Sequence, residues 1–221
     1  LLSFSYRPMP LKTFIVRDPK TRKISKSHFR DRVVHHALCN VIEPIFQKSF
    51  IYDSFANQIE KGTLKAIERL DYFKRKVSLN NTQVCYLLKS DIKQYFETVD
   101  QDTMVSIIRR KITDDRIIWL IRVILDNYHS KEEGKGMPLG NLTSQFFANV
   151  YLNELDQFVK HNLKIKYYIR YVDDFIILHD KKEDLEYYKH RINEFLEENL
   201  LIRLHSGKTK IFALQNGVDF L

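Results

Sequence analysis

The chain has 221 residues, of which 44% are hydrophobic, and its formal net charge is +8 at pH 7. This length and composition allow a buried core in one or two compact units, and the positive charge favours a polyanionic partner such as nucleic acid. No apolar run approaches the roughly 20 residues of a membrane-spanning helix, so we expect no membrane partner.

The two cysteines, Cys39 and Cys85, lie in apolar stretches and lack the close spacing of a zinc site. We therefore expect no disulfide framework and no zinc, and we expect a cytoplasmic location. The chain has no initiator Met, and its last residues, 217–221, have the character of a strand that is cut short. We accordingly expect a fragment of a longer protein.

The first half of the chain predicts two strands separated by two helices. A strand over residues 14–16 enters a basic turn. Apolar residues at helical spacing predict a helix over residues 31–44, which its proline ends, and a second helix over residues 64–73. The apolar run over residues 84–90 predicts a mostly buried strand.

The second half mixes helical and strand patterns. In chain order it predicts helices over 102–111 and 115–128, a glycine-rich loop, a helix over 142–161, strands over 167–172 and 175–179, a helix over 182–199, and strands over 201–205 and 210–213. This order predicts an α+β fold in which one antiparallel sheet carries helices on one face.

Two adjacent carboxylates, Asp173 and Asp174, stand between two apolar strands, at the tip of a predicted hairpin. Paired carboxylates repel each other and are costly to desolvate without a counter-ion. A hard cation such as Mg²⁺ resolves this conflict because it prefers oxygen ligands. An Asp-Asp pair also suits an ordinary turn, but the flanking apolar strands favour the functional interpretation.

Another carboxylate, Asp91, stands at the end of the buried strand over residues 84–90. An aspartate at a strand end is commonly a turn or cap residue. Together with the hairpin pair, however, it would complete a two-metal cluster of the kind that phosphoryl transfer uses.

Six segments, in order along the chain, resemble the motifs of bacterial reverse transcriptases. Tyr171-Val172-Asp173-Asp174 is similar to their Tyr-x-Asp-Asp motif, and residues 90–96 are similar to their first catalytic-aspartate motif. The other four segments cover residues 31–38, 136–145, 206–210 and 217–221. The resemblance implies a right-hand polymerase without its thumb, with fingers over residues 1–85 and palm over 86–221. Residues 102–135 are able to pack with either part.

The middle motif, residues 136–145, departs from the usual pattern. It has Leu139 before Gly140 and Gln145 after Ser144, where most reverse transcriptases have Gln and Pro. This version is most similar to the enzymes of diversity-generating retroelements, which are related to group II intron and retron enzymes. That resemblance implies frequent misincorporation opposite template adenine and a small basic accessory protein as a partner.

The resemblance also implies the metal site. Asp91, Asp173 and Asp174 would hold two Mg²⁺ ions, for which Mn²⁺ can substitute, and the backbone carbonyl of Ile92 would add a ligand. Lys208 would protonate the departing pyrophosphate, and Lys210 is a close rival for that role.

Further positions match the substrate contacts of the family. Phe96 would lie beneath the sugar and reject a 2′ hydroxyl, Gly140 and Gln145 would adjoin the nucleotide, and Arg17 and Arg22 would bind the triphosphate by bidentate contacts. Four of these positions have an ordinary alternative: core packing for Phe96, a loop-to-helix turn for Gly140, and a solvated turn for the two arginines. Lys20 or Lys23 could also take the place of the arginines.

The implied function is RNA-directed DNA synthesis, in which dNTPs are added to the 3′ end of a DNA or RNA primer on an RNA template. Two alternatives stay open. One is a silent module that binds RNA without polymerising, which has no need of paired carboxylates. The other is an antiviral polymerase that extends without a template.

Overall fold

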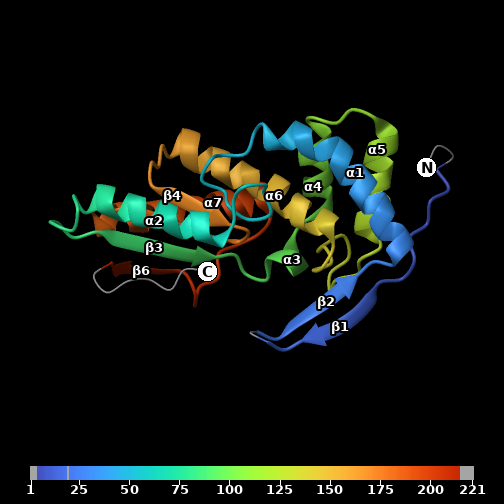
Figure 1. The fold of residues 1–221 in the computed structure, drawn as a ribbon, viewed down its shortest axis with the longest axis horizontal. Coiled ribbons are helices and arrows are strands. Elements are labelled where there is room, and N and C mark those ends of the chain that lie inside the picture. The colour runs from blue at the N-terminus through green and yellow to red at the C-terminus, as the bar shows by residue number, and fades with distance from the viewer. Residues whose placement is uncertain (1–3, 19, 215–221) are drawn as a thin grey trace. The chain divides into compact units, whose positions relative to one another are not determined.

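The computed structural model describes residues 4–18 and 20–214. The chain forms two compact units: unit 1 comprises Leu1–Ser49 and Gln94–Tyr151, and unit 2 comprises Phe50–Lys93 and Leu152–Leu221 (Figure 1). Residues 102–135 fall in unit 1. The division into fingers and palm at residue 85 is a functional one and stays a prediction. The expected strand over residues 217–221 lies outside the described residues.

Unit 1 combines a two-stranded antiparallel sheet with helices. Its elements are β1 (Lys12–Val16), β2 (Arg22–Lys26), α1 (Phe29–Gln47), α3 (Tyr95–Thr98), α4 (Gln101–Arg109), α5 (Asp115–Asp126) and the first part of α6 (Leu142–Gln157). The Asp100 carboxylate caps α4 by accepting a hydrogen bond from the Thr103 backbone N–H at 2.8 Å. The cap satisfies one of the donors that a helix start leaves open.

The structure corrects the sequence prediction at three places in unit 1. Helix α1 does not end at Pro44 but continues to Gln47, because a proline so near the end removes few helical hydrogen bonds. Strand β2 was not predicted, since its sequence has one apolar residue, Ile24, among charged and polar ones. The four-residue helix α3 was also missed.

The buried side chain of His35, in α1, links that helix to α6. Its ring Nδ1 lies 3.2 Å from the Thr143 hydroxyl oxygen, and burial is the main cause that lowers the pKa of His35 to about 4. The pKa in an unfolded chain is about 6.5, so protonation favours unfolding. The contribution of neutral His35 to stability is therefore full above about pH 6.5 and is lost as the pH falls towards 4.

We expect His35→Gln to remove part of the acid sensitivity of the protein. Between about pH 6.5 and 4.5 the wild type should lose about 2 kcal/mol more stability than the variant. Melting curves across this pH range test the difference, with His36→Gln at the neighbouring exposed position as the matched control. Parallel pH profiles for the wild type and His35→Gln would contradict the prediction.

Unit 2 is built on a four-stranded antiparallel sheet in the order β4-β5-β3-β6. The strands are β3 (Tyr86–Asp91), β4 (Tyr168–Tyr171), β5 (Asp174–His179) and β6 (Lys210–Ala213). The helical parts are α2 (Thr63–Val77), the end of α6 with the π-helical turn η1 (Phe158–Asn162), and α7 (Lys182–Leu200). The predicted α+β class, with an antiparallel sheet covered by helices, is confirmed.

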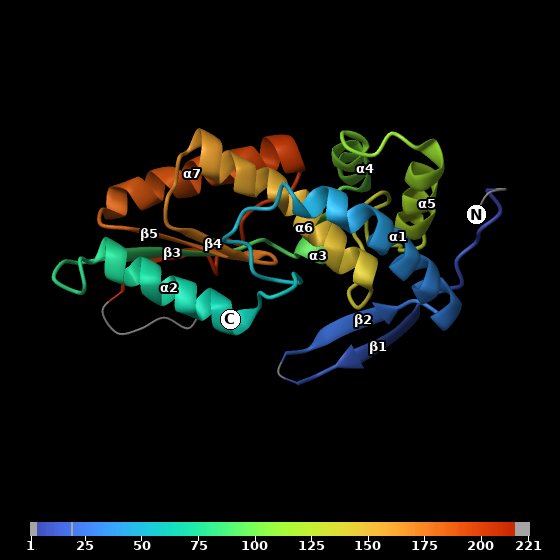
Figure 2. The same cartoon turned by 45° about the horizontal axis from the view of Figure 1, so that its top comes forward.

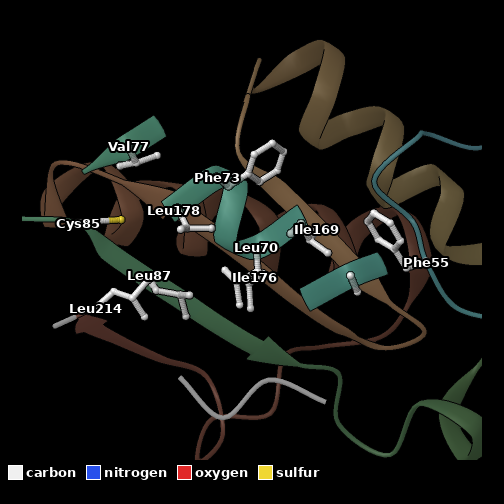
Figure 3. Close-up of a cluster of buried hydrophobic side chains, with 11 residues drawn as sticks. Phe55, Leu70, Phe73, Val77, Cys85, Leu87, Ile169, Ile176, Leu178 and Leu214 are labelled. Carbon is white, nitrogen blue, oxygen red and sulfur yellow. The ribbon is translucent and has the colours of Figure 1, made fainter. Parts of the chain in front are cut away.

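Helices cover both faces of this sheet. Helix α2 packs on one face, where Leu70 and Phe73 join a cluster that includes Leu87 of β3 (Figure 3). Successive strand residues point to opposite faces, so Leu88 points to the other face, on which α7 lies (Figure 2). Leu87 and Leu88 are both fully buried. The expectation that helices occupy one face is therefore wrong.

The predicted strand over residues 201–205 is also wrong. Helix α7 runs to Leu200, and the chain then makes an isolated bridge between Leu204 and Ile92. Among residues 4–18 and 20–214, no helix is long and apolar enough to cross a membrane.

Candidate active site

The hairpin between β4 and β5 carries the Asp173-Asp174 pair. Tyr171 and Asp174 face each other across the two strands, so Val172 and Asp173 form the turn. Val172 has a φ of +54°, a left-handed conformation that is unusual for a β-branched residue. The tip is therefore a strained turn whose geometry depends on its surroundings.

The strand order brings Asp91 to the same edge. Asp91 is the last residue of β3 and is the cross-strand partner of Asp174 on β5. The carbonyl of Asp91 accepts a hydrogen bond from the backbone N–H of His205 at 2.8 Å, and the Lys93 N–H donates to the carbonyl of Arg203 at 2.9 Å. Directly opposed residues of neighbouring strands have their Cβ atoms about 4.5–5.5 Å apart, so two carboxylates leave the sheet side by side.

Acidic side chains gather at this edge. Burial, followed by the charge of Asp174, raises the pKa of Asp173 to about 6, and the charge of Asp91 acts in the same direction. Lys208 opposes this repulsion: its Nζ lies 2.8 Å from Asp91 Oδ2, and this contact raises the pKa of Lys208. The three carboxylates thus repel one another, and Lys208 offsets part of that repulsion.

The donors fit a hard divalent cation in kind. Carboxylate oxygens are the ligands that Mg²⁺ and Mn²⁺ prefer. The raised pKa of Asp173 reflects burial first and then repulsion by Asp174, and a bound cation would offset both. Among the described residues, no group of three or more His, Cys, Asp or Glu side chains is already gathered as a metal site. A bound ion would therefore have to draw the three carboxylates together. Ile92, the other predicted ligand, is buried directly after Asp91.

The predicted triphosphate contacts lie in unit 1. Val16 pairs with Arg22 across the β1–β2 hairpin, so Arg17 and Arg22 flank the same turn, and both are exposed. The unit also holds Phe96, Gly140 and Gln145, whereas the three carboxylates and Lys208 belong to unit 2. That these two sets form one nucleotide site stays a prediction.

The loop that carries Gly140 is fastened to strand β2. The Ser25 N–H donates to the Leu139 carbonyl at 2.9 Å, and the Asn141 side chain bonds the backbone N–H of Ser27 at 2.8 Å and the carbonyl of Ser25 at 2.9 Å. Gly140 has a φ of +114°, and a Cβ there would lie 2.6 Å from Ile24 Cγ2. This close approach to β2 requires a glycine, whatever its part in nucleotide binding.

Gln145 and Phe96 are the remaining predicted contacts. Gln145 is exposed on the first turns of α6. The Phe96 ring is half-buried against Tyr95, with centroids 5.4 Å apart, and the Phe96 carbonyl accepts a hydrogen bond from the Met137 N–H at 2.8 Å. Phe96 is therefore partly packed, as the core-packing alternative predicts, and partly accessible.

A buried ion pair beside the hairpin was not found from the sequence. Arg170, in β4, and Asp156, in α6, are both fully buried and lie 2.7 Å apart. One sequence feature could have indicated this pair: an arginine stands two residues from Tyr168, on the same face of an apolar strand. A charge on an inward face demands a partner, but the strand pattern does not say which acidic residue provides it.

Comparisons with known proteins identify the family of the chain. Residues 16–221 match the family described as reverse transcriptase (RNA-dependent DNA polymerase). The chain therefore belongs to the reverse transcriptase family.

Two proteins are similar to this chain over nearly its whole length. Protein YkfC of Escherichia coli is 26% identical over an alignment that covers all of this chain and 68% of YkfC. The group II intron-encoded protein LtrA of Lactococcus lactis is 23% identical, with 98% of this chain and 47% of LtrA covered. The chain thus spans about half of the intron-encoded relative.

The fold has a counterpart among solved structures. Apo telomerase from Candida tropicalis superposes with a TM-score of 0.68, over 96% of this chain and 46% of that one, at 13% sequence identity. At this identity the likeness concerns the fold alone.

Proposed function

We propose that this chain is the catalytic part of an RNA-directed DNA polymerase that adds dNTPs to a primer 3′ end. The observation that carries the proposal is the convergence of Asp91, Asp173 and Asp174 at neighbouring strand ends, with Lys208 bound to Asp91. Membership of the reverse transcriptase family supports the same reaction.

The three carboxylates would hold two Mg²⁺ ions, which supply Lewis-acid stabilisation to the attacking and leaving oxygens. In the reaction, the primer 3′ hydroxyl loses its proton to solvent, and the bond from its oxygen to the α-phosphorus forms as the bond from that phosphorus to pyrophosphate breaks. The chain's own groups contribute in two ways. The carboxylates fix the position of the charge, and Lys208 donates a proton to the departing pyrophosphate.

A substitution at Lys208 tests that role. We expect Lys208→Met to lower kcat by about 100-fold, the usual effect of losing a general acid, with KM for dNTP little changed. Lys210→Met is the matched control, because Lys210 lies two residues further on, in β6 opposite Lys89. Steady-state extension assays separate the two lysines. A larger loss in Lys210→Met would assign the acid to Lys210.

Primer extension by the full-length protein tests the polymerase itself. We expect templated DNA on a defined RNA template with Mg²⁺ and all four dNTPs. Tight RNA binding without product would favour the silent binding module, and untemplated product would favour the template-independent polymerase.

We further propose that the enzyme is error-prone. Leu139 and Gln145 in the middle motif, which is similar to that of diversity-generating retroelement enzymes, support this proposal. Sequencing of the extension products tests it. Errors concentrated opposite template adenine are the expected result, and uniformly accurate copies would refute low fidelity without touching the polymerase assignment.

A further inference from the structure

Arg170 is a charged side chain with no access to solvent. Its exposed fraction and that of its partner Asp156 are both 0%. Two guanidinium nitrogens bind the carboxylate side on, with Arg170 Nε 2.8 Å from Asp156 Oδ1 and Arg170 Nη2 2.7 Å from Asp156 Oδ2. The Tyr168 hydroxyl donates to the same carboxylate at 2.8 Å. The guanidinium is therefore held in one orientation by helix α6.

The third nitrogen of this guanidinium reaches the hairpin tip. Arg170 Nη1 donates a hydrogen bond to the carbonyl of Val172 at 2.9 Å. Val172 is the residue whose φ of +54° strains the turn, and such a conformation persists when neighbouring groups over-determine it. The contact therefore acts where the hairpin needs outside support.

The backbone of Arg170 is fixed as well. Its N–H donates to the Asp53 carbonyl at 3.0 Å, and its carbonyl accepts from the Phe55 N–H at 3.0 Å. On the other edge of β4, Arg170 pairs with Phe175 of β5. Because the backbone N–H and carbonyl of Arg170 are both bonded to the segment that holds Asp53 and Phe55, the guanidinium reaches Val172 from a fixed backbone.

We propose that Arg170 is a positioning residue for the Asp173-Asp174 turn. Anchored by Asp156, its guanidinium holds the Val172 carbonyl and so sets the direction of the two carboxylates before a divalent ion binds. The binding of a divalent ion by those carboxylates rests on the proposed function. The ordering of the turn by Arg170 does not depend on it. Groups that orient metal ligands in this way commonly change metal affinity by about 10- to 100-fold when removed.

A variant that keeps the fold is needed, because removing Arg170 alone leaves Asp156 as an unpaired buried charge. The triple variant Arg170→Met, Asp156→Leu and Tyr168→Phe removes the Arg170–Asp156 pair together with the hydroxyl that bonds to Asp156. Apolar side chains of similar volume commonly replace a buried ion pair without loss of stability. The Val172 carbonyl then loses its guanidinium donor while the packing around it is retained.

Two measurements on the full-length protein test the proposal. Hydrogen exchange followed by mass spectrometry reports on the peptide containing residues 171–175, and titration with Mn²⁺ alone, followed by electron paramagnetic resonance, reports on the carboxylates. We expect exchange at the tip to be at least about tenfold faster in the triple variant, as for the loss of a charged hydrogen bond. Mn²⁺ affinity should fall by about 10- to 100-fold.

The control is Arg191→Met, which breaks another arginine–carboxylate pair of unit 2, that of Arg191 with Glu194 on helix α7. It should change neither measurement. Unchanged exchange at the tip in a folded triple variant would overturn the proposal, as would faster exchange with unaltered Mn²⁺ affinity. A wild type that fails to bind Mn²⁺ would instead contradict the proposed function, and the exchange rates would still decide whether Arg170 orders the turn.

Discussion

Asp173→Asn should abolish primer extension, with a loss of more than about 10³-fold in kcat, because an amide cannot supply the negative charge that a divalent ion requires. The change is nearly isosteric, so packing at the hairpin should be retained. Extension of a labelled primer, with saturating Mg²⁺ and a matching melting curve, measures the effect.

The stability of Asp173→Asn should not fall with its activity. Asp173 is repelled by Asp174 and Asp91 in a partly buried site, so a neutral amide removes an unfavourable interaction from the metal-free fold. We expect a melting temperature equal to or above that of the wild type. Loss of activity together with unfolding would not support a catalytic role.

The control for this variant is Asp180→Asn. Asp180 follows directly after β5, at the opposite end of that strand from Asp174, and is exposed. The same chemical change there should leave extension intact. Substantial extension by a folded, metal-supplied Asp173→Asn protein would sink the two-metal proposal.

Asp156→Ala should produce the largest loss of stability. It removes the counter-charge of the Arg170 guanidinium, which has no exposed surface, and also deprives the Tyr168 hydroxyl of its acceptor. Breaking a buried ion pair by removing one partner costs about 3–5 kcal/mol. Urea denaturation followed by circular dichroism measures the shift in midpoint.

The triple variant of the Arg170, Asp156 and Tyr168 cluster serves as the comparison for Asp156→Ala. The triple variant at positions 156, 168 and 170 has no stranded charge, so its urea midpoint should lie much closer to that of the wild type than the midpoint of Asp156→Ala. A loss below about 1 kcal/mol in Asp156→Ala would mean that water or another group reaches the guanidinium. In that case the rigidity that we attribute to this cluster would be wrong.

Local patterns sufficed for much of the fold and for part of the site. The apolar runs around Asp173 and Asp174 predicted the hairpin, and periodic apolar residues predicted the helices that became α1, α2 and α6. Asp91 was found because it ends an apolar run, and the strand order then placed it opposite Asp174.

The features that were missed depend on contacts between distant residues. Strand β2 is exposed over most of its length, so it lacks the alternation that marks a half-buried strand, and Asn141, more than 100 residues away, bonds to it. The Arg170–Asp156 pair likewise joins a strand to a helix. In both cases the partner is chosen by the tertiary structure, and no local pattern encodes it.

The fastening of the Gly140 loop to strand β2 affects how residue changes accumulate over evolution. Because a side chain at position 140 would meet Ile24, and Asn141 bonds to both Ser25 and Ser27, the basic hairpin and the glycine-rich loop cannot diverge independently. A smaller residue at position 24 would remove that contact, but the φ of +114° at Gly140 would still strain any other residue there, and a change at Asn141 would remove its side-chain hydrogen bonds to Ser25 and Ser27. Residue changes in the basic hairpin should therefore be accompanied by changes in the glycine-rich loop, and the reverse.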